Sequence, residues 1–210
     1  MVEAIKAAVA QAPPRKFRQS VELAFNLRGV DLSVPKNRID EDVLLPHGRG
    51  AGVRVAVIGS AEISEKAKGV ADTVITPEQL TELSADRKAA KRLANQHSFF
   101  IAEAPLMPTV GKTLGIVLGP RGKMPRPVPP GSDPRTAIDN MRRTVKVRSR
   151  DRRTFHSPLG HVEMAPEQLA ENAEAVIKRV LGRLEGGINN VQSIYVKTTM
   201  GPSVKVPWTG

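Results

Sequence analysis

The chain has 210 residues, of which 40% are hydrophobic and 25% charged, values typical of a folded globular protein rather than a disordered one. Lys and Arg number 32 against 21 Asp and Glu, so the net charge of +11 favours a polyanionic partner, nucleic acid or an anionic membrane surface. The absence of cysteine excludes disulfides, zinc–thiolate sites, iron–sulfur ligation and cysteine nucleophiles. No segment approaches about 18 consecutive apolar residues, so we expect no membrane span and a cytoplasmic protein.

The N-terminal part has the pattern of a mixed α+β unit. Its spacing predicts a helix over 1–11, a strand over 20–28, a loop over 29–42 and a short strand over 43–45. In the first strand, Val21, Leu23, Phe25 and Leu27 alternate with polar residues, which predicts one buried and one available polar face. The glycine-rich segment around Gly48 then provides a hinge.

Beyond the hinge, strands and helices alternate. The patterns predict strands over 53–58, 71–75 and 98–102, and helices over 61–68, from Thr76, over 84–95, over 107–117 and from Asp133 to Arg143. Thr76, Pro77 and Gln79 supply an N-cap, a proline at the first helical position and a capping-box partner. Residues 119–134 hold six of the 17 prolines and predict a loop. Such alternation is typical of a three-layer α/β unit with a largely parallel sheet.

The C-terminal part returns to the first style. We expect strands over 144–149, 153–157 and 161–164, an amphipathic helix over 166–184 and a last strand over 191–199. The predicted fold therefore has two domains, α+β and α/β: residues 1–48 and 144–210 form a discontinuous α+β domain, and 49–143 an inserted Rossmann-like α/β domain. The hinges would lie near Gly48 and Thr144, although two sequential domains remain an alternative.

Three kinds of catalytic or metal site find little support. Gly111-Lys112-Thr113 resembles the end of a P-loop, but the required first glycine is replaced by Leu106 and the segment lies in a predicted helix. His156 and His161 share no helical face, and no carboxylates cluster nearby, so we expect no metal site. No Gly-x-Ser-x-Gly elbow is present. We therefore expect that the protein is not an enzyme and binds no cofactor.

Basic segments are more informative. Residues 142–153 carry seven cations and one acid, and on a strand Lys146, Arg148, Arg150 and Arg152 would share one face at roughly 7 Å intervals. That spacing suits successive phosphates of a nucleic acid. The alternative is an edge strand that charges protect from aggregation.

The end of the last strand offers a different surface. Thr198 to Lys205 combine hydroxyls, a bare backbone and a methionine in a tight turn, which suits recognition of structured RNA by shape and 2′-hydroxyls. An ordinary strand end with a Gly-Pro turn explains the segment equally well. The chain has only five Phe, one Tyr and one Trp, which disfavours sequence-tolerant single-strand binding by stacking.

Four blocks, in the same order along the chain, resemble the L-one family of large-subunit ribosomal proteins. They are Phe17-Arg-Gln-Ser-Val-Glu22, Leu45-Pro-His-Gly48, Leu118-Gly-Pro-Arg-Gly-Lys-Met-Pro125 and Tyr195-Val-Lys-Thr-Thr-Met-Gly-Pro-Ser-Val204. The segment Lys123–Pro130 and Asn37-Arg-Ile39 are similar to the archaeal branch.

The resemblance implies a structural ribosomal protein. Its first domain would bind structured large-subunit rRNA, form the mobile stalk beside the tRNA exit site and aid release of deacylated tRNA. The protein would also bind its own mRNA and repress its translation, contact other large-subunit components and be a monomer off the ribosome. The residues carried over as RNA contacts are Lys16, Phe17, Ser20, Glu22, His156, Ser193, Thr199, Met200 and Gly201.

Two rival classes remain: an α/β nucleotide-binding protein or enzyme, and a binder of chromatin or membrane surfaces that reads charge alone. For the RNA-binding interpretation, Thr199→Ala is expected to cost about 1–3 kcal/mol of binding while leaving thermal stability nearly intact.

Overall fold

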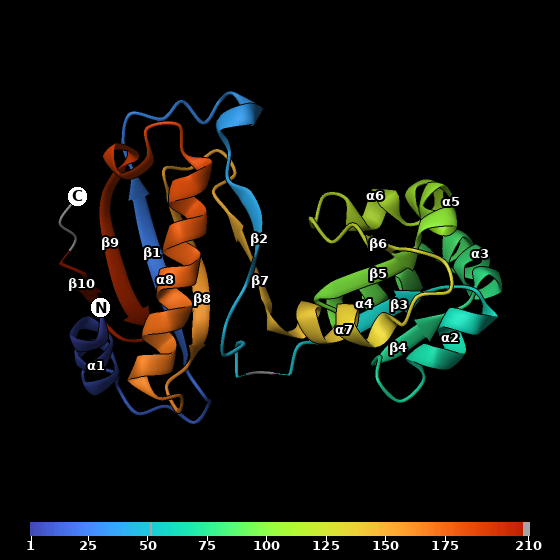
Figure 1. Ribbon diagram of the computed structural model, residues 1–210, viewed down its shortest axis with the longest axis horizontal. Helices are drawn as coiled ribbons and strands as arrows, with labels where there is room; N and C mark the ends of the chain where they lie inside the picture. Colours follow the sequence, from blue (N-terminus) through green and yellow to red (C-terminus); the bar gives the residue numbers. More distant parts are fainter. Residues whose placement is uncertain (51, 208–210) are drawn as a thin grey trace. The chain divides into compact units, whose positions relative to one another are not determined.

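The computed structural model describes residues 1–50 and 52–207, and the chain forms two compact units (Figure 1). Unit 1 comprises Met1–Ala51 and Arg143–Gly210, and unit 2 comprises Gly52–Arg142. Both ends of the chain therefore contribute to unit 1, while unit 2 is continuous in sequence.

Unit 1 is built on an antiparallel sheet with the strand order β10-β9-β1-β8. Its strands are β1 (Ser20–Leu27), β8 (Thr154–His161), β9 (Val191–Thr198) and β10 (Ser203–Lys205). A separate antiparallel pair consists of β2 (Asp40–Leu44) and β7 (Thr144–Arg148). The helices are α1 (Val2–Ala10) and α8 (Pro166–Arg183), with short 3₁₀ turns η1 (Pro35–Asn37) and η3 (Gly187–Asn190).

The alternation in β1 divides the sheet into two faces, as the sequence predicts. Val21, Leu23, Phe25 and Leu27 are buried and join one core with α1 and α8. Phe25 stacks on Phe155 of β8, with ring centroids 5.0 Å apart. Figure 1 shows α8 lying across this face of the sheet. The opposite face is left to the polar residues of β1.

Three predictions for unit 1 need correction. The strand expected over 153–157 continues to His161 as β8, because a β-bulge opposite Val21 and Glu22 accommodates the segment around Pro158. The second strand, expected over 161–164, does not form, since residues 162–164 lie in a turn. The expected loop over 29–42 contains η1 and the start of β2. Strand β10 was not predicted, because three residues alone do not indicate a strand and β10 forms only by pairing with β9.

Unit 2 has a four-stranded sheet in the order β4-β3-β5-β6, and every pairing is parallel, as predicted. The strands are β3 (Val55–Ile58), β4 (Thr73–Ile75), β5 (Phe99–Glu103) and β6 (Arg126–Val128). The helices are α2 (Ala61–Ala67), α3 (Pro77–Ala85), α4 (Arg87–Gln96), α5 (Met107–Thr113), α6 (Gly115–Leu118) and α7 (Pro134–Arg143), with the 3₁₀ turn η2 (Ala104–Leu106).

Two hydrophobic clusters, one on each face of this sheet, give the predicted three layers. Ile58 and Phe100 pack with α3, α4, α5 and α6, whereas Val57 and Ile101 pack with α2 and α7. The predicted capping box of α3 is present: the Gln79 N–H donates to Thr76 Oγ1 at 3.4 Å, and the Thr76 N–H donates to Gln79 Oε1 at 3.2 Å.

Unit 2 also departs from the sequence-based expectation in three places. The helix expected over 107–117 is interrupted at Leu114 and forms α5 and α6. Strand β6 lies inside the segment expected to be a proline loop; it pairs only with β5, and an edge strand tolerates Pro127. The helix expected over 84–95 begins instead at Arg87, with Asp86 as its N-cap.

Candidate nucleic-acid interface

The open face of the unit 1 sheet carries a row of polar side chains that three strands bring together. Asn26 of β1 lies opposite Thr154 of β8 and Ser193 of β9. The Asn26 amide donates to Ser193 Oγ at 2.9 Å, and Thr154 Oγ1 donates to Asn26 Oδ1 at 2.8 Å. These bonds orient the row, and the Ser193 hydroxyl keeps its own proton for another acceptor.

Further along the same face, Glu22 lies close to His156 of β8. Its carboxylate is 3.6 Å from Nδ1 of His156, and its backbone pairs with Lys197 of β9. The Glu22 side chain is 29% exposed and that of His156 50% exposed. A carboxylate held in this way is an acceptor that can receive a hydrogen bond from a ribose hydroxyl or a base amino group.

Thr199 closes the end of the sheet. The Ser20 N–H donates to Thr199 Oγ1 at 3.0 Å, and the Thr199 N–H donates to the Ser20 carbonyl at 3.0 Å. The Met200 N–H donates to Gln19 Oε1 at 3.1 Å, while Nε2 of Gln19 donates to the Pro13 carbonyl at 2.7 Å. The two chain segments at this end are therefore fixed to each other before any ligand arrives.

Two large apolar side chains project from this fixed end. Phe17 and Met200 are each 51% exposed. Phe17 lines a cleft of about 500 Å³ together with Lys16, Arg15 and Val162. Exposed apolar side chains beside cations are suited to packing on a base or a ribose while the cations meet phosphates.

The position of Gly201 has no room for a side chain. A Cβ at this position would lie 2.3 Å from Oγ1 of Thr198, inside any real contact distance. Its N–H donates to the Thr198 carbonyl at 3.3 Å and so makes the turn tight. Gly201 thus shapes the loop that presents Met200.

The nine residues that the resemblance singles out lie on this face or at this end of the sheet. Thr154, Tyr195 and Lys197 share the same face but could not be identified from the sequence. Their grouping depends on the register between distant strands. The only local signal was the alternation of polar and apolar residues within each strand.

The secondary basic patch is not the row that the sequence predicts. Strand β7 ends at Arg148, and Arg150 lies in a turn with a φ of 51°, so Arg150 and Arg152 do not continue the strand face. Lys146 lies 3.6 Å from an Asp40 carboxylate oxygen, and Nε of Arg148 lies 3.2 Å from the other. These two cations are neutralised by β2, which is about a hundred residues away in sequence and could not be paired with them by pattern.

The expected hinge residues Gly48 and Thr144 both belong to unit 1. Gly48 has a φ of 65°, and its carbonyl accepts a hydrogen bond from the buried Asn172 amide at 2.9 Å. Thr144 is buried and begins β7. The side chain of Arg143 donates to the Pro46 carbonyl.

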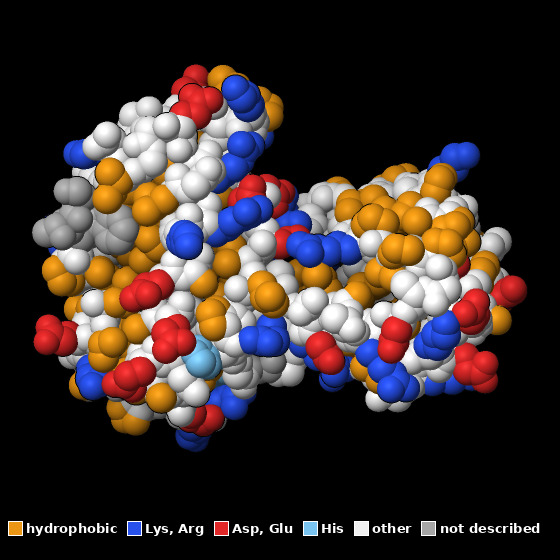
Figure 2. Space-filling model, in the orientation of Figure 1, with side chains coloured by type: hydrophobic (Ala, Val, Ile, Leu, Met, Phe, Trp, Pro, Cys, Tyr) orange, Lys and Arg blue, Asp and Glu red, His pale blue; other side chains and the backbone are white. Residues whose placement is uncertain are grey.

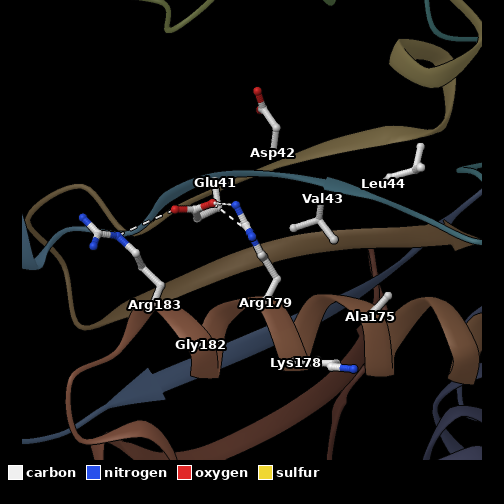
Figure 3. Close-up of a pocket in the computed structure, with 9 residues that line it drawn as sticks. All are labelled: Glu41, Asp42, Val43, Leu44, Ala175, Lys178, Arg179, Gly182 and Arg183. Atoms are coloured by element: carbon white, nitrogen blue, oxygen red, sulfur yellow. Dashed lines mark hydrogen bonds and ion pairs between the residues drawn. The ribbon is translucent and has the colours of Figure 1, made fainter. Parts of the chain in front are cut away.

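A groove of about 720 Å³ lies between β2 and α8 (Figure 3). Glu41 projects into it and accepts hydrogen bonds from Arg179 at 2.9 and 2.6 Å, and Arg183 lies 3.7 Å from the second carboxylate oxygen. Asp42 points away from this cluster in Figure 3. Glu41 and the two arginines form an ion-pair cluster that fixes α8 to β2, which gives this part of the groove a structural role.

The histidines lie apart from one another, and each has its own partner. His97 is buried and bonded to Thr73 at 2.9 Å, His47 contacts Glu171 at 2.6 Å, and His161 contacts the Gln19 carbonyl. Among residues 1–50 and 52–207, no group of three or more His, Asp or Glu could hold a metal ion. No helix in the described part of the chain is long and apolar enough to cross a membrane.

Unit 2 presents a different kind of surface. Figure 2 shows hydrophobic side chains gathered over the region of α5 and α6. Ile116 of α6 is 67% exposed, and Met124, in the segment after α6, is 44% exposed. Gly111, Lys112 and Thr113 lie within α5, as the sequence predicts, and not between a strand and a helix. This surface therefore lacks the geometry of a phosphate-binding P-loop.

Comparison with known proteins gives one consistent result. The model of the "Ribosomal protein L1p/L10e family" matches residues 6–202. The chain is 55% identical over 196 residues to the large ribosomal subunit protein uL1 of Thermoplasma acidophilum, covering 93% of this chain and 90% of that protein. It is 52% identical over 206 residues to the protein of the same name from Methanocella arvoryzae, covering 98% and 97%.

These relatives are archaeal and are named as ribosomal proteins, which confirms the resemblance read from the four sequence blocks. The chain therefore belongs to the ribosomal protein L1p/L10e family, in its archaeal branch, a family of structural constituents of the large ribosomal subunit rather than enzymes.

Proposed function

We propose that unit 1 anchors the protein to the large ribosomal subunit by binding a structured region of its rRNA. The observation that carries this proposal is the polar sheet face that ends at Phe17 and Met200, both half exposed and both attached to a hydrogen-bonded frame. The uL1 relatives are large-subunit proteins, and rRNA is the polyanion that a chain of net charge +11 would meet there.

The binding mechanism divides between charge and hydrogen bonds. Arg15 and Lys16 are exposed next to Phe17 and contact phosphates, which sets the position of the RNA without reading its sequence. Glu22 and Ser193 face the same side and read hydroxyls and base edges. A carboxylate repels a phosphate, so Glu22 favours an RNA shape that offers a donor at that point.

The same RNA-binding surface supports further roles, which belong to this proposal. In the large subunit, the protein forms the mobile stalk beside the tRNA exit site, contacts exit-site tRNA and aids its release. Off the ribosome it is a cytoplasmic monomer that binds a similar structure in its own mRNA and represses translation. An excess of the mRNA fragment should then displace the rRNA fragment from the protein, because both occupy one surface.

The site is tested with single substitutions of the two projecting side chains. Phe17→Ala should weaken binding to a folded stalk fragment of rRNA by about 5- to 150-fold, the range expected for loss of one base–aromatic stacking contact. Met200→Ala, which removes an apolar packing contact, should weaken binding less than Phe17→Ala. Leu44→Ala is the matched control, because Leu44 is 50% exposed in unit 1 but lies on β2.

All three variants should melt at the temperature of the unaltered protein, since each side chain is exposed. Equal affinities for the Phe17→Ala and Leu44→Ala proteins would place the RNA elsewhere on the molecule.

A further inference from the structure

Helix α4 of unit 2 presents a stripe of cations that the ribosomal assignment does not explain. Arg87, Lys88, Lys91 and Arg92 are all exposed, and the helix contains no acidic residue. The apolar side of the helix, with Ala90 and Ala94, is buried in the unit 2 core. Packing therefore fixes the helix so that the four cations face outward.

The charges on this stripe are arranged unfavourably for the isolated helix. Arg87 and Lys88 occupy the first turn, where the helix dipole is positive and repels cations. The pairs Arg87–Lys91 and Lys88–Arg92 are like charges at i,i+4 spacing, which places them side by side and destabilises a helix. An anionic ligand would relieve both repulsions at once.

The protein itself supplies little neutralisation. In the described part of the chain, no carboxylate lies within 4.0 Å of any of these four cations, whereas some other surface cations are paired, such as Lys66 with Glu62 at 2.7 Å. Asp86 caps the helix by accepting the N–H groups of Lys88 and Ala89 at 2.8 and 3.0 Å. Its pKa is lowered first by these two hydrogen bonds and to a lesser degree by the charge of Arg92. Asp86 offsets one charge, so three remain.

The chemistry of the stripe indicates which anion it fits. The i,i+4 cations lie about 6 Å apart along the helix axis, a regular spacing that suits the repeated charges of one phosphate backbone. A helix that binds a membrane surface needs an exposed apolar face. Helix α4 has none, because Ala90 and Ala94 on its apolar side face the core.

We propose that α4 is a second RNA-binding surface, which contacts the phosphate backbone of large-subunit rRNA independently of the sheet face of unit 1. This inference rests on the proposed function only for the identity of the RNA. Phosphate contacts carry no sequence information, so α4 adds affinity and salt dependence without adding specificity.

The test is a titration of the full-length chain against complete large-subunit rRNA over a range of salt concentrations. One variant replaces Arg87, Lys88, Lys91 and Arg92 with Gln, which keeps a high helix propensity. The control variant replaces four exposed unit 2 cations that are far apart in sequence with Gln, and so removes the same charge: Arg54, Lys68, Lys112 and Arg135.

The α4 variant should reduce the slope of log affinity against log salt by about 1.8 or more, equivalent to two or more lost phosphate contacts. The control variant should change the slope by less than one such contact. The preference for rRNA over scrambled RNA should be unchanged in both. Equal slopes for the two variants would overturn the inference, whereas an unaltered protein with no preference for rRNA would overturn the proposed function instead.

A second measurement does not depend on net charge. The chain contains no cysteine, so Asn95→Cys places a single reactive thiol at the exposed end of the α4 stripe. A cleavage reagent attached there should cut rRNA in the complex at defined nucleotides, and the same reagent on Thr136→Cys of α7, on the other face of the unit 2 sheet, should not. Equal cutting from the two positions, or none from Asn95→Cys, would overturn the inference.

Discussion

The Thr199 hydroxyl group, which the resemblance predicts to contact RNA, also takes part in the internal hydrogen bonding of unit 1. Its oxygen accepts the Ser20 N–H at 3.0 Å and lies 3.4 Å from the Ser20 carbonyl, so it joins the ends of β1 and β9. This hydrogen bond argues against the sequence-based expectation that Thr199→Ala leaves stability nearly intact. The resemblance identified Thr199 as an RNA contact, but the internal partner follows only from the pairing of two distant strands.

We predict that Thr199→Ala lowers the free energy of unfolding by about 0.5–1.5 kcal/mol, because a part-buried hydrogen bond is lost. Denaturant unfolding measures this directly. Thr199→Ser, which keeps the hydroxyl, should lose less than half of that stability and should retain RNA affinity. A Thr199→Ala protein as stable as the unaltered chain would show that the hydrogen bond between Ser20 and the Thr199 hydroxyl does not stabilise the fold.

At the scale of elements, Lys123 connects the loop after α6 to α4. Its ammonium donates to the carbonyls of Ala94 and His97 at 2.7 and 2.8 Å, at the C-terminal end of that helix. Burial lowers the pKa of Lys123, and the nearby Arg121 lowers it further. The ammonium thus satisfies two carbonyls that the helix leaves without partners.

Replacing Lys123 with Met should destabilise the protein by about 1–2 kcal/mol, since two charge-assisted hydrogen bonds are lost from a partly exposed site. Thermal melting followed by circular dichroism is the measurement. Lys112→Met on α5 is the control, because Lys112 is exposed and its replacement should leave the melting temperature within error. If the Lys123→Met protein melted at the same temperature as the Lys112→Met protein, the contacts of Lys123 with α4 would not stabilise the fold.

Asp72, in the segment before β4, connects that segment to the start of β3 and to α7 through Val55 and Arg142. Burial alone would raise the pKa of Asp72, but the hydrogen bond from the Val55 N–H, 2.9 Å, and the contact with Arg142, 3.5 Å, lower it below the ordinary value of 3.8. A lowered carboxylate pKa stabilises the fold at pH values above the unfolded pKa, and this stabilisation is lost as pH falls through the folded pKa.

We therefore expect Asp72→Asn to lower the melting temperature at neutral pH, and the difference from the unaltered protein to shrink as the pH is lowered below 3.8. Melting curves of both proteins across this range test the sign. A difference that grows toward acid pH would mean that burial dominates and that Asp72 is destabilising when ionised.

Most elements of the fold could be predicted from the sequence because their signals are local. The alternation in β1, the capping box of α3 and the apolar stripe of α8 each lie within one segment, and each prediction is confirmed. Strands β6 and β10 could not be predicted, since three-residue strands form only against a partner. The predicted basic row does not form, because β7 ends at Arg148 and Arg150 lies in a turn. The pairing of Lys146 and Arg148 with Asp40 of β2 could not be predicted, since β2 is remote in sequence.

For the molecule as a whole, the net charge of +11 is distributed over surfaces with different roles. On β7 the cations are internally paired, on α4 they are not, and beside Phe17 they flank an apolar side chain. The total charge predicted a polyanionic partner but could not indicate which cations remain available. That distinction required the structure, because pairing is decided by tertiary contacts.

The central claim is that the protein reads the shape of an RNA rather than its charge alone. The direct test is a binding titration against a folded stalk fragment of large-subunit rRNA beside a scrambled RNA of equal length, at low and at physiological salt. Raising the salt weakens both by about 0.9 log units per log of salt for each duplex phosphate contact. We predict that the preference for the folded fragment survives at the higher salt, and coincident curves for the two RNAs would contradict the account.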